Sequence, residues 1–133
     1  MRRVFLPLAL SAVLAGLIAT GSVRSAEAPP ELGTDLMQAI EDSNKSLSSN
    51  ISLKDAKASA ADAKDINQAF IQVEAYFAAR PDARDAVELA RKTRELTDQI
   101  AQQVGSGHFD AAADSATALS RTCRTCHTFY KKS

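Results

Sequence analysis

Two cysteines and a histidine near the C-terminus of this 133-residue sequence have types and spacing that indicate a specific chemistry. They form the segment Cys123-Arg124-Thr125-Cys126-His127. Cys-x-x-Cys-His is the pattern of c-type haem attachment. Thiols at positions i and i+3 share one helix face, so each can form a thioether bond to a haem vinyl group. His127 follows one turn after Cys123 and can bind the haem iron as its proximal ligand.

Three other uses of the two cysteines remain open. A thioredoxin-type dithiol also has Cys-x-x-Cys, but it belongs to an α/β fold. A zinc site needs further ligands, and the only other histidine is His108. Helical spacing would place His108 about 28 Å from His127. A structural disulfide suits an exported protein, but it would be strained within one helix. The pattern therefore favours haem attachment.

The first 25 residues are typical of a secretory signal peptide. Two arginines precede an apolar run over residues 4–19, and small residues suited to cleavage follow it. The run is shorter than the roughly 20 residues that span a bilayer, so we expect no stable membrane span. We expect export to the periplasm, a loose lead-in over 26–33 and one haem-binding domain over 34–133.

The composition favours a helical domain and gives no sign of a nucleic-acid partner. Removing residues 1–25 removes three arginines and no acidic residue, so the formal net charge falls from zero to −3. A nucleic-acid-binding domain would have a basic excess. Aromatic residues make up 5% of the chain, and there are only five glycines and four prolines. That balance favours helices over strands.

Four amphipathic segments follow the lead-in, and their apolar residues recur at steps of three and four, the helical period. The expected helices cover about 34–50, 53–79, 82–104 and 109–131. Short turns between them predict an all-α, up-down-up-down four-helix bundle.

Turn and capping signals set these boundaries. The serines before Asn50 are expected to end the first helix. Ser52 and Asp55 form an S-x-x-D capping signature for the second. Pro81 separates the second helix from the third, and the glycines at 105 and 107 end the third.

The apolar stripe of the last helix contains both cysteines, so an attached haem would point into the bundle. The up-down-up-down arrangement places the end of this helix beside the end of the second, which contains Phe70 and Phe77. We therefore expect these two rings to form part of the haem pocket wall. The opposite layer is rich in alanine, so the helices can close tightly there.

The motif in this position resembles the cytochrome c′ and cytochrome c-556 family, the class II c-type cytochromes. Leu36-Met37-Gln38-Ala39-Ile40 is similar to the first-helix motif of that family, and Cys123 to Lys131 is similar to its end. The resemblance covers residues 32–131. It implies a four-helix bundle with one covalent haem c that carries electrons or binds small gases. It leaves both a monomer and a homodimer open.

The sequence departs from this family in one respect, because the first helix lacks the arginine that often lies near the haem. Another basic side chain could neutralise the haem propionates instead, although exposed basic residues are more often simply solvated. The candidates are Arg80, Arg84, Arg121, Arg124 and Lys131.

Met37 is the predicted sixth ligand of the iron. It is the only methionine left after residues 1–25 are removed. It lies near the start of the first helix, and His127 lies near the end of the last. Antiparallel packing of these helices therefore places the two residues at a similar depth, meaning a similar position along the bundle axis. A methionine on such a stripe is usually a core residue. In the family that the chain resembles, c-556 members use a methionine of this helix and c′ members leave the position open.

These patterns predict a one-electron carrier with redox proteins as partners, and not an enzyme. The motif has no acid–base pair beside it and no nucleophile with a base. A thioether ligand raises the potential of a His-ligated haem, which suits electron transfer. The alternative is a five-coordinate haem protein that binds NO or CO. A haem-free interaction module would require the Cys-x-x-Cys-His match to be accidental.

Overall fold

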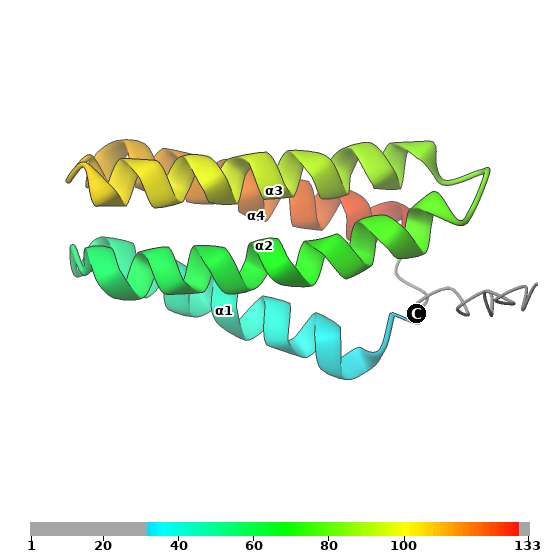
Figure 1. The fold of residues 1–133 in the computed structure, drawn as a ribbon, viewed down its shortest axis with the longest axis horizontal. Coiled ribbons are helices and arrows are strands. Elements are labelled where there is room, and N and C mark those ends of the chain that lie inside the picture. Colours follow the sequence, from blue (N-terminus) through cyan, green and yellow to red (C-terminus); the bar gives the residue numbers. More distant parts are fainter. Residues whose placement is uncertain (1–31, 131–133) are drawn as a thin grey trace, which may run out of the picture.

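The computed structural model describes residues 32–130, and all regular structure in that range is helical. The helices are α1 (Thr34–Ser52), α2 (Ala56–Ala78), α3 (Arg84–Gly105) and α4 (Phe109–Tyr130). Consecutive helices run in opposite directions and lie side by side (Figure 1). The predicted all-α, four-helix architecture is therefore confirmed for the described residues.

Some of the sequence predictions fall outside that range. The expected signal peptide at 1–25, the lead-in up to residue 31, and Lys131 all lie outside the described residues. Between residues 32 and 130, no helix is long and apolar enough to cross a membrane.

The boundary between α1 and α2 differs from the prediction because the serines do not end α1. The hydroxyls of Ser48 and Ser52 donate to carbonyl oxygens four residues earlier, at 3.1 and 2.9 Å. The N-cap of α2 is Asp55, whose carboxylate accepts a hydrogen bond from the backbone N–H of Ala58 at 2.9 Å. The predicted Ser52 capping signature is therefore wrong, since Ser52 is the last residue of α1.

The other boundaries lie close to their predicted positions. α3 begins at Arg84, after the buried N-cap Ala83, and Asp85 places a negative charge in its first turn, where the helix dipole favours it. Beyond α3, Gly107 adopts a φ of 76°, a left-handed conformation that glycine adopts without steric cost. α4 then begins at Phe109, as predicted.

The core consists largely of the predicted stripes. Each fully buried large aliphatic side chain contributes about 1.5–3 kcal/mol, and every helix supplies at least one. The largest apolar side chains with almost no exposed surface are Leu47, Ile66, Val73, Ile100, Val104 and Leu119.

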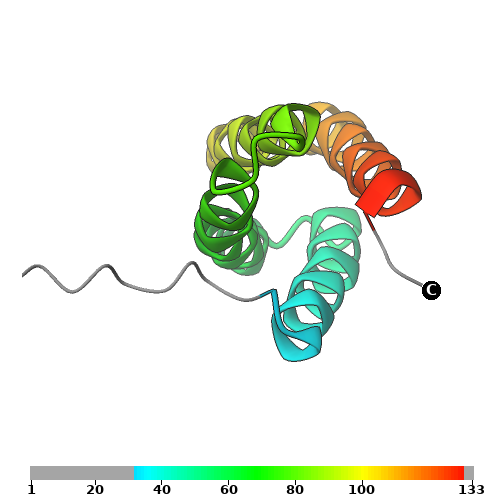
Figure 2. The same cartoon turned by 90° about the vertical axis from the view of Figure 1, so that its right-hand side faces the viewer.

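α1 diverges from the rest of the bundle toward its N-terminus. In Figure 1 its first half bends away from α2, at the end of the bundle where α4 finishes. Figure 2 views this end and shows the start of α1 and the end of α4 as separate corners. α1 has no buried residue before Ile40, and Leu36 and Met37 pack only partly buried against the core. This end is therefore covered less completely than the opposite one, where Leu47 and Ile51 are buried.

Candidate functional site

The Cys-x-x-Cys-His motif lies in the last turns of α4, at the end of the bundle where α1 diverges. Cys123 and Cys126 are free thiols, partly buried, and both pack against the core. His127 is exposed. The structure thus places the two cysteines on the inner side of α4 and the imidazole of His127 at the exposed surface of the helix.

Burial makes both thiols weaker acids. Burial, with a smaller effect of Cys126, raises the pKa of the Cys123 thiol to about 11. Burial and the carboxylate of Asp85 raise the pKa of Cys126 as well. Dithiol redox sites instead need a thiol whose pKa is depressed. This environment therefore argues against a thioredoxin-type site, whereas a neutral thioether sulfur suits an apolar position.

Residues 32–130 show no metal site built from protein side chains alone. No group of three or more His, Cys, Asp or Glu side chains is gathered there to hold an ion. His108 lies at the opposite end of α4 from His127, where its carbonyl oxygen accepts a hydrogen bond from Ala112 N–H at 3.0 Å. A haem iron needs fewer protein ligands, because the porphyrin supplies four nitrogens and the protein adds only the axial ligands.

Aromatic side chains gather beside the motif. The ring of Phe77 lies 4.9 Å from that of Tyr130, centroid to centroid, at an angle of 57°. Tyr76 also packs against Phe77, at 5.0 Å in an edge-to-face arrangement. Phe70, two turns earlier on the same stripe of α2, is also buried. The end of α2 therefore brings Phe77 next to the last turn of α4, with Tyr76 beside it, whereas Phe70 lies two turns earlier on α2.

A hydrogen bond ties the start of α3 to the end of α4. The hydroxyl of Tyr130 donates to a carboxylate oxygen of Asp85. This bond raises the pKa of Tyr130 to about 12, so its hydroxyl stays protonated at neutral pH. The sequence alone gives no sign of this pair. Only the three-dimensional proximity of the two helix ends identifies it.

The basic residues considered for the propionates differ in their surroundings. The guanidinium of Arg80 lies 3.5 Å from the centroid of the Tyr76 ring and donates to the Tyr76 carbonyl oxygen at 2.7 Å. Arg84, Arg121 and Arg124 are exposed. The three exposed arginines are therefore freer than Arg80 to move toward a ligand.

A hydrogen bond between α1 and α4 shows how these helices are aligned. Asn44 Nδ2 donates to Ser120 Oγ at 3.3 Å. Met37 lies seven residues before Asn44, and His127 lies seven residues after Ser120. Seven helical residues are two turns, or roughly 10 Å. Because α1 and α4 are antiparallel, Met37 and His127 each lie about 10 Å from this bond along their own helices, toward the same end of the bundle.

At this end of the bundle, inner-stripe side chains of α1 and α4 are incompletely covered. Leu36 and Met37 on α1 and both cysteines on α4 belong to inner stripes, yet all four are only partly buried. Farther along the same stripes, Leu47 and Leu119 are completely buried. A haem bound here would cover the four partly buried side chains and would have two thiols within its reach.

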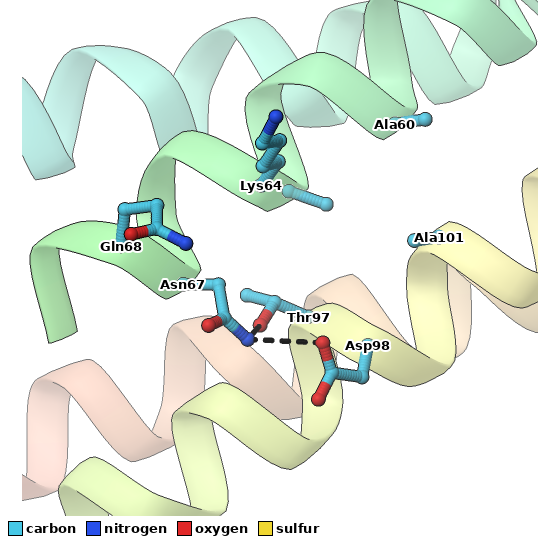
Figure 3. Close-up of a pocket in the computed structure, with 8 residues that line it drawn as sticks. Ala60, Lys64, Asn67, Gln68, Thr97, Asp98 and Ala101 are labelled. Carbon is cyan, nitrogen blue, oxygen red and sulfur yellow. Dashed lines mark hydrogen bonds between the residues drawn. The ribbon is translucent and has the colours of Figure 1, made fainter. Parts of the chain in front are cut away.

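A concave region lies away from the motif, between α2 and α3 (Figure 3). This hollow of about 320 Å³ is lined by the N-terminal part of α2 and the C-terminal part of α3. Within it, the amide of Asn67 donates to Thr97 Oγ1 at 2.8 Å and to Asp98 Oδ1 at 3.0 Å. These contacts join the two helices. The hollow contains none of the predicted site residues, so we assign it to helix packing.

Comparison with known proteins adds no independent assignment. No protein-family model, curated protein or solved structure matches this chain. The functional argument therefore depends on the motif, its place in the fold and the surroundings of its side chains.

Proposed function

We propose that this chain is an exported c-type cytochrome that carries single electrons. One haem c would be attached to Cys123 and Cys126, with His127 as its proximal iron ligand. The observation that carries the proposal is the position of the motif. Its two free thiols lie partly buried on the inner stripe of the last helix, and the histidine follows at the exposed rim. The bound haem would supply a ferric–ferrous couple.

The surrounding residues have distinct parts in this proposal. Phe70 and Phe77 form an apolar wall that excludes water and lowers the local dielectric. The hydrogen bond from Tyr130 to Asp85 fixes the last turn of α4, and so restricts where His127 can point. Phe129 is 66% exposed, two residues from His127. It offers a redox partner protein an apolar contact close to the haem.

Met37 is the sixth ligand in this proposal. Its support is the shared depth of Met37 and His127, measured from the Asn44–Ser120 hydrogen bond. Met37 is also partly buried against the core. It lies on the face of α1 that carries the apolar stripe. A thioether ligand raises the potential of a His-ligated haem, and this suits an electron carrier.

The proposed location and partners follow from the sequence. The signal-like residues 1–25 support export to the periplasm, where c-type cytochromes of this kind would meet other redox proteins. The formal charge of −3 without that segment gives no support for nucleic-acid binding. A monomer and a homodimer are both compatible with the proposal.

The alternative function is a five-coordinate haem protein that binds NO or CO. One observation favours it: Met37 lies on the diverging half of α1 and is not fully buried. If this part of α1 stayed away from the iron, the sixth position would be open to a gas. The two functions share the same attachment residues and differ only in the residue that faces His127 across the haem.

An absorption spectrum of the purified protein tests both functions. The full chain would be produced in a host that exports and matures c-type cytochromes, and the Met37→Ala variant would be made beside it. Electron transfer with His/Met ligation predicts that the wild-type haem is low-spin and does not bind CO. It predicts that the haem of the variant is high-spin and binds CO. A wild type that already binds CO would favour the gas-binding function. A wild type with no haem spectrum would contradict both.

A further inference from the structure

Asn44 is a polar residue at a position where the stripe of α1 calls for an apolar one. Ile40, Asn44, Leu47 and Ile51 follow one another at steps of four, three and four, and the other three are buried. The Oδ1 atom of Asn44 is buried, with no hydrogen-bond partner among the described residues. A buried acceptor without a hydrogen-bond partner is unfavourable. Asn44 therefore lowers stability where a leucine would raise it.

The one hydrogen bond that the side chain of Asn44 makes within the described residues is well placed to align two helices. It joins α1 to α4 through Ser120, which lies three residues before Cys123. α1 and α4 are not consecutive, so no turn connects them directly and fixes their relative height. Their apolar stripes repeat with every turn, so a slip of one turn would still bury apolar groups. The slip would move Met37 along α4 by about 5.4 Å.

We propose that the Asn44–Ser120 hydrogen bond sets the register of α1 against α4, so that Met37 lies at the depth of His127. Asn44 and Ser120 are thus positioning residues for the axial ligand, a role that depends on the proposed function. A single buried polar residue that fixes helix register at some cost in stability is a well-supported device in helical assemblies.

The chain offers a matched control in Asn50. This residue is also on α1, and its Nδ2 donates to Asp62 Oδ2 on α2 at 2.7 Å. The Asn50 bond therefore joins α1 to a different helix at the end of the bundle remote from the motif. Asn44→Leu and Asn50→Leu make the same chemical change on the same helix. Only Asn44→Leu removes a contact with α4.

The test compares haem spectra of four variants of the full, haem-containing chain, made in the host described above. Asn44→Leu and Ser120→Ala should keep the covalent haem but lose at least half of the weak red absorption band of a ferric iron–thioether bond. Both should gain CO binding in the reduced state. Ser120→Thr keeps the hydroxyl and should retain the wild-type band, as should Asn50→Leu. Ser120→Ala keeps the test informative if Asn44→Leu does not fold.

Each other outcome has a clear meaning. Wild-type spectra for Asn44→Leu and Ser120→Ala would overturn the inference and leave the proposed cytochrome intact. An equal loss of the band in Asn50→Leu would also overturn it, because general destabilisation would then explain the effect. A high-spin wild type would remove Met37 as a ligand, and the inference with it. Protein without covalent haem would overturn the proposed function itself.

Discussion

The replacement of Phe77 by leucine tests whether the aromatic wall belongs to a haem site. Phe77 is 5% exposed and contacts two rings, Tyr76 at 5.0 Å and Tyr130 at 4.9 Å. Aromatic pairs contribute about 0.5–1.5 kcal/mol each beyond their buried area. Leucine keeps an apolar side chain but removes both pairs, so the expected loss is about 1–3 kcal/mol. Both partner rings are partly exposed, which favours the lower half of that range.

The matched control for Phe77→Leu is Ile100→Val in α3. Ile100 is completely buried near the opposite end of the bundle, and Ile→Val typically costs about 0.5–1.5 kcal/mol. Urea unfolding should therefore show a loss of similar size for the two variants. Only Phe77→Leu should shift the haem absorption bands and the reduction potential. Equal spectral shifts in both variants, or none in Phe77→Leu, would refute the placement of the haem beside Phe77.

Three further predictions concern the ion pairs, a helix cap and the second histidine. Hydrogen bonds from Arg91 and Arg94 at 2.7 and 2.8 Å lower the pKa of Glu74. Its stabilising effect is therefore full above its unfolded pKa and is lost as the pH falls through the folded value. Glu74→Gln should cost about 1 kcal/mol at pH 7, and urea unfolding should show the difference shrinking below about pH 4. Asp55→Ala removes the cap of α2 and should cost about 0.5–2 kcal/mol in the same assay; no loss would refute the cap. His108→Ala should leave the haem spectrum unchanged, and a shift would mean that the arrangement of the helices is wrong.

The helices themselves were predictable from the sequence, because each carries an apolar stripe at steps of three and four. The stripes predict Phe77 beside the end of α4, and the rings of Phe77 and Tyr130 do meet. Predictions failed at the α1–α2 boundary. There the serines satisfy their hydroxyls on the carbonyl oxygens of their own helix, so a residue type that usually favours turns continues the helix.

The hydrogen bonds between helices could not be predicted, because they depend on register and side-chain direction. Nothing in the sequence pairs Asn44 with Ser120, or Tyr130 with Asp85. The sequence did contain one signal, since Asn44 interrupts an otherwise apolar stripe. The partial burial of Met37 was also not predictable, because the stripe alone does not reveal that α1 diverges at its start.

The most direct test of the account is the intact mass of the denatured protein, purified from a host that exports and matures c-type cytochromes. The wild type should be heavier than its polypeptide by one haem, which should stay with the chain in acidic organic solvent. Replacing both cysteines, Cys123→Ser with Cys126→Ser, should abolish this added mass. Haem that extracts completely from the wild type, or a wild-type mass equal to that of the polypeptide alone, would contradict covalent attachment and the cytochrome assignment with it.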